Sequence, residues 1–334
     1  MQGGLAGRQT AWVGRGTTAL WLALRAVARQ YGPGEVILPD LLCLAALEGV
    51  LLAGFTPVFA DVDAARYVLD AESVACCLTP NTRAVLVAHL FGHIADVEAI
   101  RAAAPGIPII EDAVQGFGGA LRGRPAGALG DLSFISFDAT KMIGGRGGLL
   151  LFDDDSLRAG IEADVNALSQ PPIQLENLAH LLPPAAASAY ARQLRTAVPS
   201  LLRPFDPSPA NVRRIEADWH TLTARVEARN AKARLLQARL SGSALALPHI
   251  GEGDALWRYT IAAPTAALAG WLSHHLQRAA LNGSNLYPPL SRLFGQRSGV
   301  LANRLINLWI DEHTSESDVQ RTADVILSAL VSLQ

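Results

Sequence analysis

Short hydrophobic runs alternate with longer helix-like segments between residues 16 and 152. The runs are continuous stretches rich in Val, Ile and Leu, a composition typical of strands buried on both faces of a parallel sheet. We expect strands at 35–38, 57–60, 84–89, 107–111, 132–137 and 148–152, and helices at 17–30, 41–53, 70–77 and 94–104. The alternation predicts an α/β fold in which a mostly parallel sheet lies between layers of helices.

The pattern changes after residue 155. Eight prolines divide residues 155–210 into what we expect to be short helices and loops that connect two domains and supply oligomer contacts. Further on we expect a long amphipathic helix at 212–240, a strand at 258–262, a helix at 267–280, a strand at 305–310 and a helix at 316–332. The sequence therefore predicts a large domain at 1–211 and a small C-terminal α/β domain at 212–334.

Composition and charge exclude several classes of protein. The chain has 334 residues, of which 50% are hydrophobic and 17% charged, as in a globular enzyme with a full core. The net charge of -2 and the lack of a basic cluster argue against nucleic-acid binding. The longest apolar run, 41–55, contains Glu48 and is too short to span a bilayer, so we expect no membrane segment.

The cysteines and the first residues bear on location. Cys43, Cys76 and Cys77 form no disulfide framework, and no spaced Cys/His set suggests a metal site. Residues 1–7 lack the charged-then-apolar order of a signal peptide. We therefore expect a cytoplasmic protein without a bound metal.

A carboxylate and a lysine come after two of the predicted strands. Asp112 comes at the end of the run 107–111, and Lys141 comes after the run 132–137. In a parallel sheet both belong to the edge where ligands collect. They are the two protein groups that pyridoxal phosphate (PLP) chemistry requires, an amine that binds the cofactor and a carboxylate for its pyridine nitrogen. Taken singly, Asp112 is also explained as a helix cap and Lys141 as a solvated charge.

Five stretches resemble, in order, the DegT/DnrJ/EryC1/StrS family of PLP-dependent nucleotide-sugar aminotransferases. They are GTTAL at 16–20, VILP at 36–39 with AGFTPVFADVD at 53–63, LTPNTRAVLVAHLFG at 78–92, EDAVQ at 111–115, and the segment from Gly130 to Gly148 that contains Lys141. The resemblance is dense over about 14–152 and weak over 155–205. It implies the type I fold of PLP-dependent transferases, conversion of a keto group on a nucleotide-linked sugar to an amine, glutamate as amino donor, and a homodimer.

The resemblance also assigns roles to residues. It implies that Lys141 holds the cofactor and moves the proton, that Asp112 pairs with the pyridine nitrogen, and that Glu111 points away towards a structural partner. Ser136 and the amides of Gly16, Thr17 and Thr18 are expected at the phosphate, where an ordinary helix cap would also explain the Gly-Thr turn.

Four further residues match positions of the family pattern, and two of them keep two interpretations. Gln115 reaches the cofactor ring oxygen or lies on a solvated helix face, and Asn211 reaches the phosphate of the partner chain or caps a helix. Cys43 stands where the family usually stacks an aromatic residue on the cofactor ring. His89 resembles a family residue at a strand end, and we interpret it as structural.

Departures from the family pattern leave alternative functions open. Arg15 stands where Ser or Asn is common, and Arg146 where Glu is common. A sugar dehydratase of the family would carry His in place of Lys141, which argues against that activity. A PLP transaminase acting on a cyclitol or another non-nucleotide ketone stays open. So does a non-catalytic regulator or partner subunit descended from the family.

Overall fold

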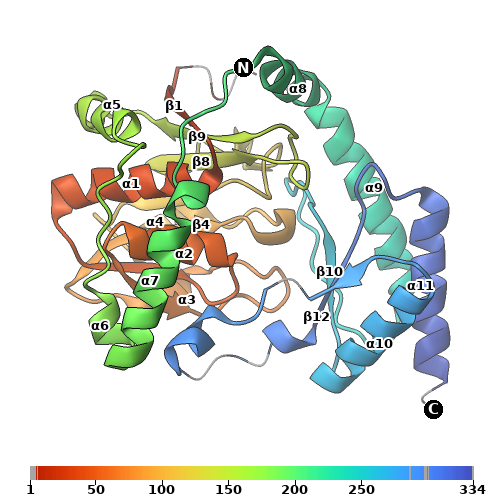
Figure 1. The fold of residues 1–334 in the computed structure, drawn as a ribbon. Coiled ribbons are helices and arrows are strands. Elements are labelled where there is room, and N and C mark those ends of the chain that lie inside the picture. Colours follow the sequence, from red (N-terminus) through yellow and green to blue (C-terminus); the bar gives the residue numbers. More distant parts are fainter. Residues whose placement is uncertain (1–4, 6, 286, 297–298, 300, 333–334) are drawn as a thin grey trace.

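A seven-stranded sheet forms the centre of the computed structural model, which describes the whole chain except residues 1–4, 6, 286, 297–298, 300 and 333–334 (Figure 1). The strand order is β1-β9-β8-β5-β4-β2-β3. The strands are β1 (Gln9–Val13), β2 (Glu35–Pro39), β3 (Thr56–Ala60), β4 (Thr82–Ala88), β5 (Ile109–Asp112), β8 (Leu132–Phe137) and β9 (Gly147–Phe152). The pairs from β3 to β8 are parallel, whereas β9 runs antiparallel to β8 and β1 antiparallel to β9. The predicted mostly parallel sheet is confirmed.

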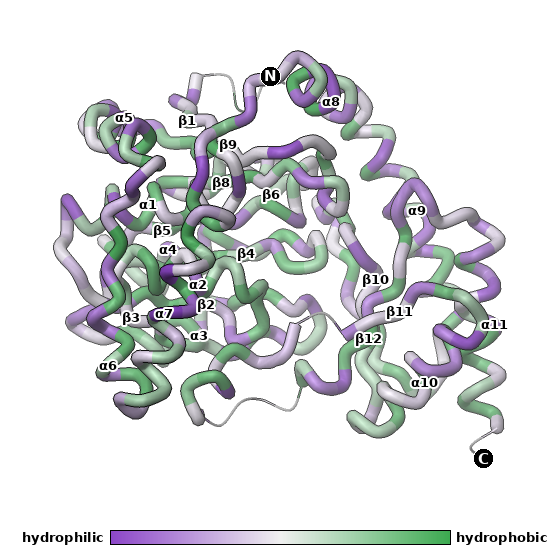
Figure 2. Tube along the Cα trace, viewed as in Figure 1, coloured by the Kyte–Doolittle hydropathy of each residue, from purple (hydrophilic) through white to green (hydrophobic). Residues whose placement is uncertain are grey.

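Both faces of this sheet are covered. In β2, Val36 and Leu38 belong to one hydrophobic cluster and Ile37 to another, and all three are fully buried. This burial on both faces explains why the strand sequences are largely continuous apolar runs. Many of the strand residues are green, the colour of hydrophobic residues, in Figure 2. The helices up to residue 201 are α1 (Gly16–Tyr31), α2 (Leu44–Leu52), α3 (Ala71–Cys77), α4 (Val97–Ala103), α5 (Arg158–Asn166), α6 (Leu178–Leu181) and α7 (Pro184–Leu201).

A second, smaller sheet lies beside the first in Figure 1. It has the order β10-β12-β11 and is antiparallel throughout. Its strands are β10 (Tyr259–Ala262), β11 (Gly283–Ser284) and β12 (Leu305–Leu308). The helices of this part of the chain are α8 (Pro209–His220), α9 (Leu222–Leu240), α10 (Ala266–Arg278) and α11 (Glu316–Val331). Ser315 and Asp318 form a capping box at the start of α11. Position 211, the expected domain boundary, lies inside α8, and the division into 1–211 and 212–334 stays a prediction.

Three elements differ from the sequence-based expectation. The proline-rich segment contains α7, an 18-residue helix that begins at Pro184 and carries Pro199 in its last turn. Proline is compatible with a first helical position because no N–H is needed there, and near the end it costs only one hydrogen bond. The expected helix 212–240 is interrupted at Thr221, between α8 and α9. Strand β1, whose mixed sequence QTAWV gives no strong signal, was not predicted.

None of the described helices has the length and apolar character needed to cross a membrane.

Candidate active site

A cavity opens at the carboxyl ends of the parallel strands. Seven of the residues singled out in the sequence line it: Gly16, Thr17, Cys43, Asp112, Gln115, Ser136 and Lys141. The other two, Thr18 and Asn211, are not among its lining residues. Arg15 and His89 also line it, and the remaining lining residues are apolar: Leu20, Leu42, Ala45, Ala46, Ala88, Leu90, Val114 and Phe134. Strand ends β4, β5 and β8 and the start of α1 thus converge on one space, as expected for a doubly covered parallel sheet.

Glu111 and Asp112 are adjacent in β5 but face opposite environments. The Glu111 carboxylate is fully buried and accepts hydrogen bonds from the backbone amides of Gly127, Leu129 and Gly130, at 2.6, 2.8 and 2.9 Å. It also accepts from Ser133 Oγ at 2.7 Å and pairs with His89 at 2.9 Å. The predicted structural role of Glu111 is confirmed. Burial tends to raise its pKa, but these hydrogen bonds lower it to about 2.

Asp112 has a much poorer set of partners. Its side chain accepts a hydrogen bond from the Val114 amide at 3.0 Å, and part of its surface is open to the cavity. Burial raises the pKa of Asp112 to about 6, although the Val114 amide and the charge of Lys141 act in the opposite direction. The turn from Asp112 to Val114 explains the Asp as a cap of the following loop. The open side leaves the carboxyl group free to meet a cationic partner in the cavity.

His89 links the buried carboxylate to the cavity wall. Its Nδ1 accepts a hydrogen bond from the Ala95 amide at 3.2 Å, so Nε2 carries the proton and donates it to Glu111 at 2.9 Å. The ring is 1% exposed. The structural interpretation of His89 is confirmed, and both ring nitrogens are engaged within the chain.

One end of the cavity is formed by the start of α1 and by Ser136. Arg15 at the N-cap position makes no side-chain capping bond, so the first amides of α1 have no side-chain acceptor there. A Cβ at Gly16 would lie 2.9 Å from Ser136 Cβ and 3.2 Å from its Oγ, so glycine is needed for this approach. The expectation for Thr18 concerned its backbone amide, and its side chain has a separate structural role. Its hydroxyl donates to Leu201 O at 2.9 Å and accepts from the Arg203 amide at 3.2 Å, which ties α1 to the end of α7.

Gln115 is held at both ends of its amide group. Its Oε1 accepts from the Phe91 amide at 2.7 Å, and its Nε2 donates to the Tyr287 hydroxyl at 2.9 Å. The residue is 6% exposed and lies in a turn rather than a helix. The interpretation as a solvated helix face is therefore wrong, because the chain turns after β5 without forming the expected helical turn.

Tyr287, the partner of Gln115, is a residue to which the sequence analysis assigned no role. It comes from the segment 285–289, of which Leu286 lies outside the described residues. Burial raises its pKa, so its hydroxyl keeps its proton and accepts from Gln115. The signal was the resemblance of Tyr287-Pro288 to the family's C-terminal His-Tyr-Pro stretch.

Asn211 performs a local task in this chain. Its Oδ1 accepts from the Arg146 amide at 2.7 Å, and its Nδ2 donates to the carbonyl groups of Arg146 and Asp206, both at 2.8 Å. All of its hydrogen-bonding groups thus face residues 146 and 206 of its own chain. Ser208 occupies the N-cap position of α8, so the interpretation of Asn211 as the cap of this helix is wrong.

The lysine itself sits in the loop between β8 and β9. Its amide donates to Asp138 O at 2.9 Å, and its Nζ lies 5.0 Å from the centre of the Trp257 ring. Asp112 and Lys141 thus reach the same cavity from neighbouring strands β5 and β8. Among the described residues, no group of three His, Cys, Asp or Glu side chains is arranged to hold a metal ion.

Comparison with known proteins relates the first half of the chain to one family. The sequence profile of the DegT/DnrJ/EryC1/StrS aminotransferase family matches residues 7–169. Residues 7–169 belong to this family. A GDP-perosamine synthase of Caulobacter vibrioides is 42% identical over 148 residues, which are 43% of this chain and 39% of that protein. An L-glutamine:scyllo-inosose aminotransferase of Streptomyces griseus is 36% identical over 167 residues, 48% of this chain and 39% of that protein.

The family fold extends over almost the whole chain. The structure of Helicobacter pylori PseC, an aminotransferase involved in the biosynthesis of pseudoaminic acid, matches 98% of this chain and 88% of its own length. The TM-score is 0.82 at 15% sequence identity. The chain therefore has the type I fold of PLP-dependent transferases, while the sequence alignments cover about two fifths of the length of the curated relatives.

Proposed function

We propose that this protein is a PLP-dependent aminotransferase that converts the keto group of a nucleotide-linked sugar to an amine, with glutamate as the amino donor. The observation that carries the proposal is the single cavity that joins Asp112, Lys141 and the Gly16–Ser136 approach at the carboxyl ends of the strands. The family relationship of residues 7–169 adds the reaction class.

The residues in the cavity fit PLP. Asp112 is a largely enclosed carboxyl group with a raised pKa, so a protonated pyridine nitrogen would supply the cationic partner that it lacks. The uncapped start of α1, with Ser136 beside it, provides hydrogen-bond donors for a phosphate group. When bound, PLP supplies an electron sink for the carbanion formed at the substrate.

The chain's own groups then have defined tasks. Lys141 would attach the cofactor through Nζ and, once released by the amino substrate, accept and return the proton at the reacting carbon. Asp112 would keep the pyridine nitrogen protonated through its charge. Gln115 is committed to Phe91 and Tyr287, so it would shape the wall beside the ring and fix the Tyr287 hydroxyl. Cys43 would cover a ring face with a small, polarisable side chain.

A cofactor-loading experiment tests the proposal. Purified protein is incubated with PLP, reduced with borohydride and digested, and the mass of the peptide that carries Lys141 is measured. We expect a pyridoxyl adduct on Lys141 and, without reduction, loss of the visible absorption band when glutamate is added, with release of 2-oxoglutarate. A colourless protein without adduct would favour the non-catalytic regulator or partner subunit instead.

The acceptor distinguishes the remaining alternative. Protein loaded with the amino group is offered either a keto-sugar nucleotide or a keto-cyclitol, and the return of the visible band is followed. We expect the nucleotide-linked ketone to react. Reaction of the cyclitol alone would favour the non-nucleotide transaminase, the activity named in the Streptomyces griseus relative.

We also propose a homodimer in the cytoplasm. A hydrophobic groove lined by Trp12, Phe205, Val212, Ile215 and Trp219 lies next to Gly145 and Gly147 in the loop after Lys141, and it offers an apolar surface to a second copy. Sedimentation at micromolar concentration should give a dimer, and Trp12→Asp should shift the equilibrium to monomer. A wild-type monomer that binds PLP tightly would refute the dimer. The three cysteines are unpaired, in keeping with a reducing compartment.

A further inference from the structure

The loop from Asp138 to Gly147 carries Lys141 and has a small internal framework. Asp138 Oδ1 accepts hydrogen bonds from the amide and the hydroxyl group of Thr140, at 3.0 and 2.9 Å. The Lys141 amide donates to Asp138 O at 2.9 Å. These bonds define the turn before the lysine, but they involve only neighbouring residues and do not tie the loop to the rest of the protein.

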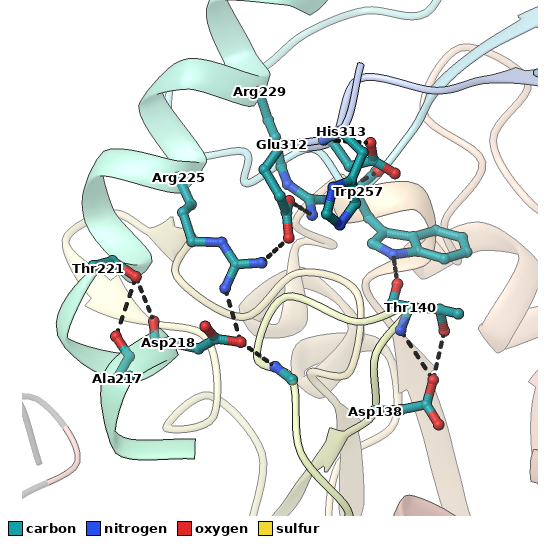
Figure 3. A network of polar contacts seen from close by, with 12 residues as sticks. Asp138, Thr140, Ala217, Asp218, Thr221, Arg225, Arg229, Trp257, Glu312 and His313 are labelled. Atoms are coloured by element: carbon teal, nitrogen blue, oxygen red, sulfur yellow. Dashed lines mark hydrogen bonds and ion pairs between the residues drawn. The ribbon is translucent and has the colours of Figure 1, made fainter. Parts of the chain in front are cut away.

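Trp257 contacts this loop on the side that precedes the lysine. Its Nε1–H donates to Thr140 O at 2.7 Å, as Figure 3 shows. Its ring centre lies 5.0 Å from Lys141 Nζ. The residue is 3% exposed, and its own amide donates to Phe91 O at 2.8 Å. An indole that is held by its backbone and buried has little freedom to move with the loop. Its two contacts therefore restrain both the backbone beside Lys141 and the amine itself.

Asp218, on α8, contacts the loop on the C-terminal side of the lysine. Its Oδ2 accepts from the Gly144 amide at 2.7 Å (Figure 3). The same carboxylate pairs with Arg214 at 3.2 Å and Arg225 at 3.1 Å. The Gly144 amide is thus bound by a carboxylate that is itself held by two guanidinium groups, which makes a charge-assisted bond.

Trp257 and Asp218 are connected to each other through charged residues of the part of the chain that follows α8. Arg225, which pairs with Asp218, also pairs with Glu312, and Glu312 pairs with Arg229 at 2.7 Å. Arg229 Nη1 then donates to the carbonyl oxygen of Trp257 at 3.3 Å. Figure 3 labels the residues of this circuit from Thr140 and Trp257 through Arg229, Glu312 and Arg225 to Asp218, and Asp218 meets the loop again at the Gly144 amide.

We propose that Trp257 and Asp218 are positioning residues that hold the loop on both sides of Lys141 and so direct its amine into the cavity. The inference rests on the proposed function, in which that amine binds PLP. Asp218 acts on the lysine through the loop, and Trp257 acts through the loop and through its ring beside the amine, while the chemistry stays with Lys141. A reacting group gains most of its advantage from being held in a productive orientation, so release of either contact should slow its reaction without changing its reactivity.

The test uses Trp257→Phe, which keeps an aromatic ring but removes the N–H donor, and Asp218→Ala. Hydrogen–deuterium exchange of the amides of residues 140–143 is measured in protein without PLP. Gly144 is left out, because its own N–H loses its acceptor in Asp218→Ala. We expect exchange to be about fivefold faster in each variant, the factor that one net hydrogen bond contributes.

A second readout is the capture of PLP, monitored by the visible absorption band at a series of PLP concentrations. We expect the maximal rate of capture to fall by about fivefold or more, while the PLP concentration that gives half of that rate stays as in the wild type. Matched controls are Trp271→Phe and Asp324→Ala. Trp271 lies on α10, and Asp324 pairs with Arg239 on the outer side of α9, so neither control should change either readout.

The outcomes separate two claims: that Trp257 and Asp218 hold the loop around Lys141, which we call the clamp, and that the protein binds PLP as proposed. Faster exchange with an unchanged capture rate would mean that the contacts are only structural, and the positioning role would be overturned. Unchanged exchange and capture in both variants would overturn the clamp itself. If wild-type protein captures no PLP, the proposed function fails, and the exchange of residues 140–143 alone decides whether the clamp exists. If Trp257→Phe does not fold, Asp218→Ala tests the opposite side of the loop.

Discussion

Asp112 and Lys141 reach the same cavity, but different parts of the chain hold them there. Asp112 ends β5, and its neighbour Glu111 is bound by side chains and amides between residues 89 and 133. The Lys141 loop is bound by Asn211, Asp218 and Trp257, all beyond residue 210. The carboxylate half of the site is therefore assembled within the segment that matches the family profile, whereas the lysine half depends on residues C-terminal to that segment.

The two halves also differ in how complete their bonding is. Glu111 is surrounded by donors, while the carboxyl group of Asp112 is left with one backbone amide and an opening to the cavity. One acidic residue thus stabilises the fold and the next one is held in an unfavourable state that a ligand can relieve. Functional groups commonly have perturbed pKa values for this reason.

Lys141→Ala should have the largest effect, because it removes the group that the loop presents. We expect transamination to be abolished. The thermal unfolding temperature should stay close to that of the wild type, because the side chain lines the cavity and contacts the Trp257 ring. Coupled detection of 2-oxoglutarate gives the activity. Turnover near the wild-type rate would show that another amine performs the chemistry.

Asp112→Asn tests the carboxylate half. We expect turnover to fall by at least about a hundredfold, since the neutral amide no longer holds the pyridine nitrogen protonated by charge. PLP should still bind to Lys141, as checked by borohydride reduction. If turnover were normal, the partner of the pyridine nitrogen would have to be another group, and Asp112 would serve only to cap its loop.

The same substitution should stabilise the protein without PLP. The pKa of Asp112 is raised from 3.8 to about 6, so its ionisation costs folding stability fully above pH 6 and not at all well below 3.8. Asp112→Asn removes this cost, and we expect a gain of about 1–3 kcal/mol at pH 8 that disappears near pH 3. Urea unfolding at both pH values measures it, and a loss of stability at pH 8 would contradict the assignment.

Glu111→Gln should have the opposite effect on stability. The pKa of Glu111 is lowered from 4.5 to about 2, so its ionised form stabilises the fold above about pH 4.5, and this contribution is lost as the pH falls towards 2. The amide cannot accept all five bonds, and we expect a loss of about 2–3 kcal/mol at pH 7. The gap between variant and wild type should narrow on acidification, and a gap that does not depend on pH would argue against an ionised Glu111.

Gly16→Ala should give the smallest of these effects and concerns cofactor affinity. The added Cβ would lie 2.9 Å from Ser136 Cβ, so the start of α1 has to shift away from the strand end. We expect PLP to bind about tenfold more weakly, which corresponds to the loss of one or two hydrogen bonds to the phosphate. A fluorescence titration measures it. Gly270→Ala on α10, where a Cβ would meet no atom within 4 Å, is the control that should bind PLP normally.

Much of the first half of the fold was predictable from local pattern. The six expected strands between 35 and 152 are present because apolar runs of this length favour strands that are covered on both faces of a sheet, and all of them but β9 take parallel neighbours. The edge strand β1 and the helix α7 were missed. β1 has a half-polar sequence, and its pairing with β9 is a long-range choice; α7 contains prolines only where a helix tolerates them.

The sequence by itself identified Asp112 and Lys141 as the candidate chemical groups, since both come after runs that are typical of buried strands, and parallel strands end at one edge of their sheet. The tertiary structure decided how each one is held. Nothing near Trp257 or Asp218 in the sequence announces contact with the Lys141 loop, because such contacts join residues 74 and 117 positions apart and depend on how the second unit packs. Likewise the sequence left Asn211 with two interpretations, a phosphate contact across a dimer or a helix cap, and gave no sign of its hydrogen bonds to Arg146, because the partner of a polar side chain is set by three-dimensional proximity rather than by its neighbours in sequence.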